Sequence, residues 1–406
     1  MKLFYFGSVC ADEVFNDTVK KSKVKPSDSA QNFENALIKG FLENNVELTV
    51  VSAESIATYP KGNRLILKER KDSLNTGCAS DILPAINLPL FKQNGHTKGA
   101  KKRLIKWLKD NKDESEKCVL VYGIYPAVVK SLQKLCAQNR CKIFAVITDV
   151  PSTMFTYTQN KSVLKRLFSG SYRKAAIELQ GKFDGYIYLT EAMSEEVAPG
   201  KPYTVVETIA DTSIFDTVGT PEKSVPPAVM YAGALYKKYG VDLIVDSFEK
   251  VKSNCELWLF GSGDYEEEIK KKAQRNTRIR FFGRVPRQEV LQYEKKASLL
   301  LNIRSGKEVY TKYSFPSKMA EYLLSGTPLL TTKLPGIPEE YYDYCYVTAT
   351  GDTGKIAERI DGILHDSNTA AFGYKAKEYV EKHKNSYAQA ARIIRFLKEQ
   401  IDGGIL

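Results

Sequence analysis

Short apolar runs alternate with amphipathic segments along most of the chain. In the first half, five runs have the length and composition of buried strands: Leu3–Phe6, Glu47–Val51, Val119–Tyr122, Ile143–Ile147 and Tyr186–Leu189. Helical spacing between them predicts helices at about residues 30–43, 98–110, 126–138 and 191–197. This alternation predicts a parallel sheet with helices on both faces. Residues 52–97 show little periodicity, and no element is predicted there.

The second half repeats the pattern more clearly. Its predicted strands are Val229–Gly233, Leu257–Gly261, Ile279–Gly283, Leu299–Ile303 and Leu329–Thr331. Helices are expected at about residues 240–252, 264–274 and 287–296. Three of the strands end on glycine, which lets a ligand approach the backbone closely. Because open parallel sheets bind ligands outside the carboxyl ends of their strands, we expect a ligand site there.

A chain of 406 residues is too long for one hydrophobic core and indicates two domains. We place them at residues 1–205 and 206–385, each a doubly wound α/β domain. The Pro-rich segment Pro221–Pro227 is the expected linker. The tail, residues 386–406, has helical spacing of apolar residues up to Ile401.

Lys and Arg exceed Asp and Glu by 12, and much of the excess lies in two segments of the first half. One is Lys98–Lys109, where cations surround Leu104, Ile105, Trp107 and Leu108. The other has Lys161, Lys165, Arg166, Arg173 and Lys174 around apolar residues. Such basic amphipathic helices can lie on an anionic membrane surface. The alternative is two solvated helix faces packed on a sheet. No nucleic-acid motif accompanies the charge, so no nucleic-acid partner is expected.

The cysteines, histidines and termini exclude several classes of protein. Seven cysteines form no CxxC pair and mostly adjoin apolar runs, so we expect reduced core thiols. Neither the three histidines nor the carboxylates have metal-ligand spacing, so neither a metal nor a resident cofactor is expected. The apolar run after Met1 is too short for a signal peptide, and none is long enough to span a bilayer. We expect a cytoplasmic protein, at most peripheral on the inner face of the cell membrane.

The segment from Tyr313 to Gly326 has the features of a ligand-binding helix. Pro316 suits a first helical turn and Gly326 a helix end. The amides from Phe315 to Lys318 would then be free at the positive end of the helix dipole, where a phosphate binds well. Ser317 and Glu321 share a face, roughly 6 Å apart along the axis, which a diphosphate and a ribose diol would span. The alternative is an ordinary amphipathic helix with a solvated Glu321.

This segment resembles the signature of the GT-B glycosyltransferases of family 4, the retaining "group 1" class with nucleotide-sugar donors. Two Glu residues separated by seven others mark that family. Glu321 stands at the second, which binds the nucleotide ribose, and Tyr313 stands at the first. A polysaccharide-assembly branch resembles the chain more closely, with a Phe-Pro-Ser-Lys helix start and an Arg after the preceding strand, here Arg304. The resemblance covers residues 228–345 best. It implies two Rossmann-like domains facing a cleft, with the C-terminal helix returning to the first.

A second segment, Tyr231–Gly240, resembles the family's Gly-Arg-Leu and Lys-Gly elements, whose Arg and Lys neutralise the donor diphosphate. Ala234 and Tyr239 stand at those two positions, so the resemblance implies that other cations replace them. The candidates are Arg304, Lys318, and Lys237 or Lys238. We favour Arg304, because a cation directly after an apolar strand is unusual unless it faces a site. The alternative is a surface Arg whose stem lies along the strand end.

Other residues take weaker roles from the resemblance. The loops at Gly233, Gly261 and Gly263 would lie beneath the nucleotide, where a structural role is more natural than direct contact. Arg284 and Val285 match the segment that meets the base, although it could equally be a strand-to-helix turn.

The first domain carries fewer matches. Asp149 follows a buried strand, with Thr148 in place of the family's His. It is a candidate for binding sugar or acceptor hydroxyls, or else a turn residue before Pro151. Gly7 and Asn32 replace the family's glycine-rich loop on the acceptor side.

The resulting hypothesis is a hexosyltransferase that moves a sugar with retention from a nucleotide diphosphate sugar to an acceptor. The acceptor is a saccharide, free or lipid-linked, in capsule or exopolysaccharide biosynthesis. A nucleotide-sugar epimerase of the same fold is one alternative. A catalytically inactive scaffold is another, because the usual residues are absent at Ala234, Tyr239 and Tyr313.

Overall fold

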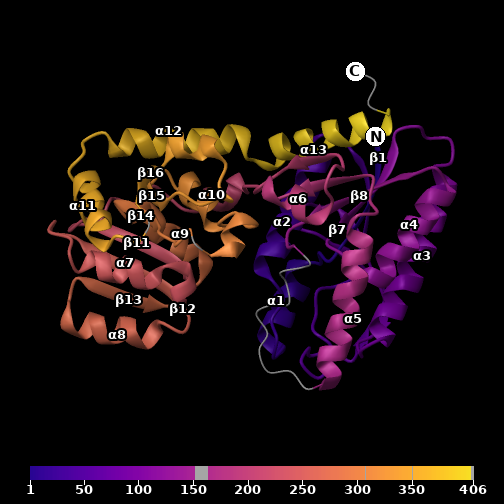
Figure 1. The fold of residues 1–406 in the computed structure, drawn as a ribbon, viewed down its shortest axis with the longest axis horizontal. Helices are drawn as coiled ribbons and strands as arrows, with labels where there is room; N and C mark the ends of the chain where they lie inside the picture. Colours follow the sequence, from indigo (N-terminus) through magenta and orange to yellow (C-terminus); the bar gives the residue numbers. More distant parts are fainter. Residues whose placement is uncertain (151–162, 307, 350, 404–406) are drawn as a thin grey trace. The chain divides into compact units, whose positions relative to one another are not determined.

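The computed structural model describes residues 1–150, 163–306, 308–349 and 351–403. The chain divides into two compact units, one of residues 1–209 with 386–406 and the other of residues 210–385. Each unit is built on its own, largely parallel sheet, with helices on both faces (Figure 1). The predicted α/β class with two Rossmann-like domains is confirmed.

The sheet of the first unit has the strand order β10-β9-β8-β7-β1-β2-β5-β4. Its strands are β1 (Lys2–Gly7), β2 (Glu47–Ser52), β4 (Arg70–Ser73), β5 (Ala79–Ile82), β7 (Lys117–Tyr122), β8 (Lys142–Ile147), β9 (Gly185–Tyr188) and β10 (Tyr203–Val205). All neighbours pair in parallel except β4 and β5. A separate antiparallel pair joins β3 (Ile66–Leu67) to β6 (Ala85–Ile86). The helices are α1 (Asp12–Lys21), α2 (Asp28–Glu43), α3 (Phe91–Asp110), α4 (Pro126–Gln138), α5 (Val163–Gln180) and α6 (Ala192–Val197).

The C-terminal helix α13 (Ser386–Ile401) completes the first unit. It packs on α2, where Ala390, Ile393 and Leu397 join the same core as Leu37 and Phe41. Its apolar residues recur every three or four positions, so they share one helix face that must be covered. The predicted return of the C-terminal helix to the first domain is confirmed.

The sheet of the second unit is parallel throughout, in the order β13-β12-β11-β14-β15-β16. The strands are β11 (Ala228–Ala234), β12 (Glu256–Ser262), β13 (Ile279–Gly283), β14 (Leu299–Asn302), β15 (Leu329–Thr332) and β16 (Tyr346–Thr348). The helices are α7 (Val241–Phe248), α8 (Glu266–Arg275), α9 (Arg287–Lys296), α10 (Lys318–Leu324), α11 (Thr353–Leu364) and α12 (Thr369–His383). Short 3-10 helices are η1 (Thr212–Phe215), η2 (Lys237–Tyr239), η3 (Val309–Lys312) and η4 (Glu339–Tyr344).

Two boundary predictions need correction. The Pro-rich segment 221–227 lies inside the second unit rather than between units, because Lys223 Nζ donates to Ala297 O at 2.7 Å and Ser224 N to Lys296 O at 3.0 Å. Helix α3 begins at Phe91, seven residues before the predicted start. None of the helices in the described ranges has the length and apolar character needed to cross a membrane.

Candidate functional site

Backbone packing shapes the carboxyl edge of the second sheet. Gly261 has a φ of 124°, and a Cβ there would lie 1.8 Å from Gly233 O. A Cβ on Gly263 would lie 2.2 Å from Leu235 O. The loops after β11 and β12 therefore touch backbone to backbone, which only glycine permits. The predicted structural role of these glycines agrees with this geometry.

Glu321 lies on α10 at this edge of the sheet and is buried, with 8% of its surface exposed. Its Oε2 accepts hydrogen bonds from Arg287 Nη2 at 2.9 Å and Nε at 3.3 Å, and its Oε1 accepts one from Lys318 Nζ at 2.5 Å. The alternative of a solvated Glu321 is therefore wrong. The helix is shorter than predicted, since it begins at Lys318 after Ser317.

The two cations set the protonation of Glu321. Burial alone would raise the pKa of its carboxyl, but the charges and hydrogen bonds of Lys318 and Arg287 hold the pKa below its ordinary value. Glu321 is therefore a carboxylate at neutral pH. Each carboxylate oxygen has two lone pairs, so capacity remains for the hydroxyls of a ligand.

Glu294 on α9 was not found from the sequence. It is fully buried, and no described residue donates a hydrogen bond to either of its carboxyl oxygens. Burial and the negative charge of Glu321 raise the pKa of Glu294 well above its ordinary value. Glu294 is therefore neutral beside an ionised Glu321. A Glu in a highly charged helix gave no sequence signal for burial, because only the packing of α9 covers it.

Arg304 follows β14 and is half-buried. Its backbone N donates to Thr332 Oγ1 at 3.0 Å, and that hydroxyl donates to Arg304 O at 2.8 Å. In the described part of the chain its guanidinium has no carboxylate partner, and its Nε is buried without an acceptor. Since a half-buried cation without a counter-charge is costly, the arrangement favours an anion from outside the chain.

Tyr239 supports this cation. The Arg304 guanidinium lies 5.1 Å from the centre of the Tyr239 ring, within cation–π range. Gly240 follows with a φ of 77°, and a Cβ there would lie 2.2 Å from Ile303 O, so this loop passes directly against the strand end. Tyr239 therefore stands at the position of the family's Lys, and its ring makes a cation–π contact with Arg304. The neighbouring Lys237 and Lys238 are exposed.

The remaining predicted donor-site residues lie in two places: Arg284 and Val285 follow β13, and Tyr313 and Phe315 precede α10. Arg284 is exposed and donates to Ser262 Oγ at 2.7 Å, so it lies where β12 and β13 end, and Val285 is half-buried against the core. The ring of Phe315 belongs to the core, 5.1 Å from that of Tyr341. Only the backbone of Phe315 is therefore available to a diphosphate. Tyr313 is half-buried beneath Lys312, with Nζ 5.7 Å from the ring centre.

In the first unit, Gly7 leaves room for a buried carboxyl. Glu34 on α2 is fully buried and accepts hydrogen bonds from Tyr5 Oη at 2.8 Å, Ser8 N at 2.9 Å and Ser8 Oγ at 2.5 Å. A Cβ on Gly7 would lie 1.9 Å from Glu34 Oε2. Burial raises the pKa of Glu34 to about 7, although these hydrogen bonds oppose the rise.

Asn32 does not take the position expected beside this loop. It is exposed, whereas Gln31 is buried and donates from Nε2 to Cys10 O at 2.6 Å. Gln31 and Glu34 are three residues apart and share the helix face that meets the loop, while Asn32 points elsewhere on the helix. The loop is therefore closed by Gln31 and Glu34.

Asp149 lies just after β8, and its side chain is exposed. Its Oδ2 accepts a weak hydrogen bond from Thr148 Oγ1 at 3.5 Å. Desolvation by surrounding atoms raises the pKa of Asp149, and the hydroxyl of Thr148 opposes this. Strands β1, β7 and β8 are neighbours, so Asp149 and the Glu34 cluster belong to the same edge of the sheet.

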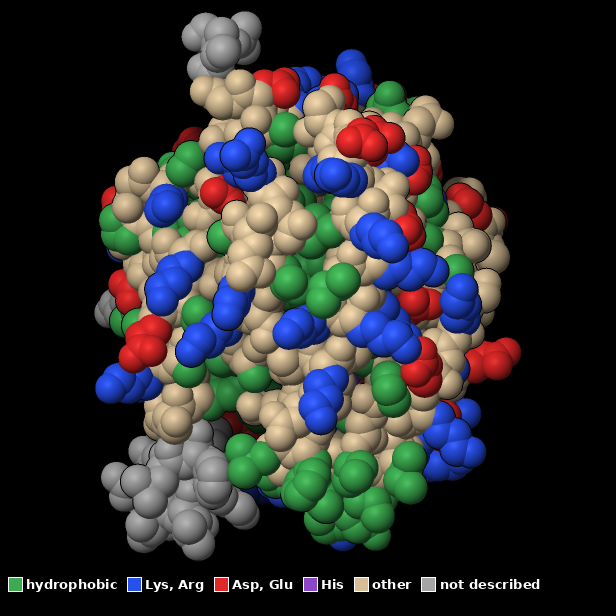
Figure 2. Space-filling model, turned by 90° about the vertical axis from the view of Figure 1, so that its right-hand side faces the viewer, with side chains coloured by type: hydrophobic (Ala, Val, Ile, Leu, Met, Phe, Trp, Pro, Cys, Tyr) green, Lys and Arg blue, Asp and Glu red, His purple; other side chains and the backbone are tan. Residues whose placement is uncertain are grey.

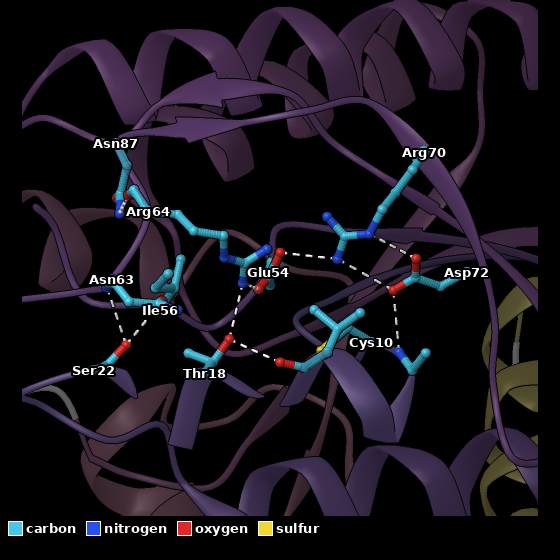
Figure 3. A network of polar contacts seen from close by, with 12 residues as sticks. Cys10, Thr18, Ser22, Glu54, Ile56, Asn63, Arg64, Arg70, Asp72 and Asn87 are labelled. Carbon is cyan, nitrogen blue, oxygen red and sulfur yellow. Dashed lines mark hydrogen bonds and ion pairs between the residues drawn. The ribbon is translucent and has the colours of Figure 1, made fainter. Parts of the chain in front are cut away.

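The segment for which no element was predicted is held by a polar network (Figure 3). Glu54 is buried and binds Arg64 Nη2 and, at 2.9 Å, Arg70 Nη2. Arg70 Nε also donates to Asp72 Oδ1 at 2.7 Å, and Asp72 Oδ2 accepts from Ala11 N at 3.1 Å. These ion pairs fasten the loop after β2 to the start of α1. Both arginines are therefore engaged within the protein.

The comparison with protein families matches part of the chain, and the comparison with solved structures matches nearly all of it. Residues 226–366 match the family model described as "Glycosyl transferases group 1". Sucrose-phosphate synthase from Thermosynechococcus elongatus superposes with a TM-score of 0.62 at 13% identity, over 99% of this chain and 100% of that one. HepE of Anabaena in complex with UDP also gives a TM-score of 0.62 at 13% identity, over 98% and 100% of the two chains.

The lipopolysaccharide outer core galactosyltransferase WaaB gives a TM-score of 0.58 at 13% identity, over 100% of both chains. The sequence matches no curated protein. At these identities the structural matches establish the fold alone, and the family model matches only residues 226–366. The chain therefore has the GT-B glycosyltransferase fold, and its residues 226–366 match the group 1 glycosyl transferases.

Proposed function

We propose that the protein transfers a hexosyl group, with retention, from a nucleotide diphosphate sugar to a saccharide acceptor. The observation that carries the proposal is the pair of opposite charges at the carboxyl edge of the second sheet. Glu321 is buried yet ionised, and Arg304 is a half-buried cation without a carboxylate partner among the described residues. A nucleotide diphosphate offers hydroxyls to the first and negative charge to the second.

Each part of the donor has a candidate partner. Glu321 accepts hydrogen bonds from the ribose diol, and Arg284 with Val285 adjoins the base. Arg304 and the amides of Ser317 and Lys318 bind the diphosphate. Helix α10 has only seven residues, so its dipole contributes little, and the cation carries more of the stabilisation. Charge that develops on the leaving diphosphate then has a fixed positive partner in Arg304.

The structural neighbours indicate which ligands to test first. HepE was solved with UDP, with UDP and glucose, and with UDP-glucose, which supports uridine diphosphate sugars as first donors. WaaB is a galactosyltransferase of the lipopolysaccharide outer core, which supports a surface-polysaccharide acceptor. On this proposal the acceptor is a saccharide, free or lipid-linked, and Asp149 binds one of its hydroxyls or one of the transferred sugar.

A panel of nucleotide sugars tests the proposal even when no acceptor is added. Slow release of free nucleotide diphosphate supports a transferase, whereas conversion of the sugar supports an epimerase. The anomeric configuration of a product, measured by NMR, tests retention. Replacing Glu321 by Ala should weaken donor binding by about 10- to 100-fold, because charge-assisted hydrogen bonds to the ribose are lost. Unchanged donor affinity and turnover in that variant would refute the role of Glu321.

An inactive scaffold is the second candidate. It is favoured by one observation, that Ala234, Tyr239 and Tyr313 stand where the resembled family has an Arg, a Lys and a Glu. Binding of a nucleotide sugar without turnover of any donor, with or without acceptor saccharides, would support it over the transferase.

A further inference from the structure

Exposed apolar side chains gather at one end of the first unit. Ile66 and Ile86 face each other across the antiparallel pair of β3 and β6, so their side chains project from the same face. Ile66 is 64% exposed, and Ile86 is exposed beside it. Their strand neighbours Leu67 and Ala85 project from the other face and are buried. One face of this small ribbon is thus packed, and the other offers isoleucines to solvent.

Four further apolar side chains join the two isoleucines. Asn87 links two of them to the ribbon, because its N donates to Leu65 O at 2.7 Å and its O accepts from Tyr59 N at 2.9 Å. Leu90 and Phe91 follow at the start of α3, and Phe91 is 60% exposed. We refer to this set as the apolar tip: Tyr59, Leu65, Ile66, Ile86, Leu90 and Phe91. Figure 2 shows hydrophobic side chains gathered along the lower edge of one face.

Stability does not account for the apolar tip. Leu90 has a φ of 66°, a left-handed conformation that is uncommon for leucine and costs free energy. The loop that precedes it is held by Asn87, whose Nδ2 donates to Arg64 O at 2.8 Å (Figure 3). The same Nδ2 also donates to Ala57 O at 2.9 Å. Single exposed apolar residues are common, but a held cluster marks an interaction surface.

Positive charge surrounds the apolar tip. Residues 58–71 contain five Lys or Arg and α3 contains seven, of which Arg64, Arg70 and Arg103 form ion pairs within the first unit. Lys61, Lys68, Lys98, Lys101 and Lys102 are exposed and make no ion pair with a described residue. Figure 2 shows many Lys and Arg side chains on the face that adjoins the hydrophobic edge. The surface therefore has an apolar edge beside exposed lysines.

Helix α3 does not present its main apolar face to a membrane, contrary to one interpretation of the sequence. The sequence left open a helix that lies with its apolar face on the membrane surface, but Leu104, Trp107 and Leu108 are buried. Trp107 packs on Phe4 of the sheet with ring centres 5.7 Å apart. The lysines of α3 from Lys98 onward remain exposed, whereas Lys92 and Arg103 are half-buried and bind within the protein. Lys161, Lys165 and Arg166 of the second predicted basic cluster lie outside the described side chains.

We propose that the apolar tip inserts into the interfacial layer of an anionic lipid bilayer, while the surrounding lysines bind lipid phosphates. Charge complementarity favours lipid over a protein partner, because the unpaired charges around the tip are cationic and spread over two separate segments. Apolar side chains buried at the headgroup boundary and electrostatic attraction to anionic lipid add together in such contacts. The inference does not depend on the proposed transferase activity.

Sedimentation with vesicles tests the inference on the full chain without any donor. The protein should sediment with vesicles of phosphatidylcholine mixed with phosphatidylglycerol, and far less with phosphatidylcholine alone. Added salt should release it. The double variant Ile66→Ser with Phe91→Ser should lower the partition coefficient between vesicle and water by at least about tenfold. The reason is that it lacks two apolar side chains whose transfer from water to lipid is favourable. A control, Val225→Ser with Tyr374→Ser, alters two strongly exposed apolar residues of the second unit and should bind as the native chain does.

A second pair of variants separates the contribution of the lysines to vesicle binding from that of the apolar tip. Lys98→Glu with Lys102→Glu should also lower binding by at least about tenfold, whereas Lys252→Glu with Lys355→Glu, exposed lysines of the second unit, should not. Circular dichroism and thermal melting establish that each variant is folded.

Three results would overturn the inference. They are no sedimentation of the native protein with either vesicle, equal sedimentation with both, or tip variants that bind as their controls do. If sedimentation velocity shows that the tip variants dissociate a native dimer while vesicle binding is unchanged, the surface binds a second copy of the chain and the lipid assignment is wrong.

Discussion

Replacing Arg304 by Ala should separate ligand binding from stability. The half-buried guanidinium has no ion pair with a described residue, and its main side-chain contact is the face of Tyr239 at 5.1 Å. Loss of that cation–π contact costs about 0.5–1 kcal/mol, and relief of an unpaired, partly desolvated charge offsets much of it. We therefore expect the free energy of unfolding to change by less than about 1 kcal/mol.

The effect on ligand binding should be larger and selective. A charge-assisted hydrogen bond to phosphate contributes about 1.5–3 kcal/mol, which corresponds to about 10- to 150-fold in the dissociation constant. The binding of a nucleoside diphosphate, measured by isothermal titration calorimetry, should weaken by this factor. The binding of the matching nucleoside, which lacks the diphosphate, should remain as it is in the native protein.

Arg280 provides the control for a cation on the same sheet. It is exposed and forms an ion pair with Glu256 at 3.2 Å. Arg280→Ala should leave both ligands unaffected. If Arg304→Ala binds the diphosphate as the native protein does, or weakens nucleoside and diphosphate equally, Arg304 is not the phosphate cation. A loss of several kcal/mol in unfolding free energy would instead show that Arg304 is a structural residue.

Three further changes test the site by other routes. Tyr239→Phe keeps an aromatic face beside Arg304 and should bind the donor with the native affinity. Tyr239→Ala removes that face and should bind the donor about two- to fivefold more weakly. Equal affinities of the two variants in calorimetry would contradict the stacking role of Tyr239. Glu34 has a folded pKa of about 7 against an ordinary value of 4.5, so its contribution to stability is full below about pH 4.5 and falls by roughly 3 kcal/mol as pH rises to 7 and above. Urea unfolding of Glu34→Gln should lack this part of the pH dependence, and parallel pH profiles of the two proteins would rule the assignment out. Gly261→Ala should destabilise the protein by at least about 2 kcal/mol in the same assay, since its Cβ would overlap Gly233 O, and unchanged stability would show that the loops can separate.

Strand prediction succeeded where local pattern and tertiary environment agree. The central strands β1 and β11 are buried on both faces, so their apolar runs are continuous and visible in the sequence. The elements between residues 52 and 97 were missed because β3 and β6 have two residues each and lie in a region held by ion pairs. The network of Glu54, Arg64 and Arg70 has no periodicity that a sequence pattern could reveal.

The candidate site also contains some residues that the sequence predicted and others that only the structure shows. Glu321 and Arg304 were predicted because they stand in a first helical turn and directly after a strand, at positions that resemble a family signature. Glu294 and Glu34 gave no signal, since a Glu in a helix ordinarily faces solvent and only packing by other elements buries it. Phe315 was assigned to the diphosphate, yet its ring belongs to the core, because side-chain direction depends on the neighbours of the segment.

The sequence by itself determined the two α/β domains, and it predicted the edge of the second sheet as a ligand site with Glu321 and Arg304 as its candidate residues. These follow from periodicity and from residues adjacent along the chain. The tertiary structure alone decided which charges are paired, which carboxyls hold a proton, and which apolar residues remain exposed at the tip. Those properties depend on burial and on distances between segments far apart in the sequence, such as Glu34 beside Gly7 and Arg287 beside Glu321.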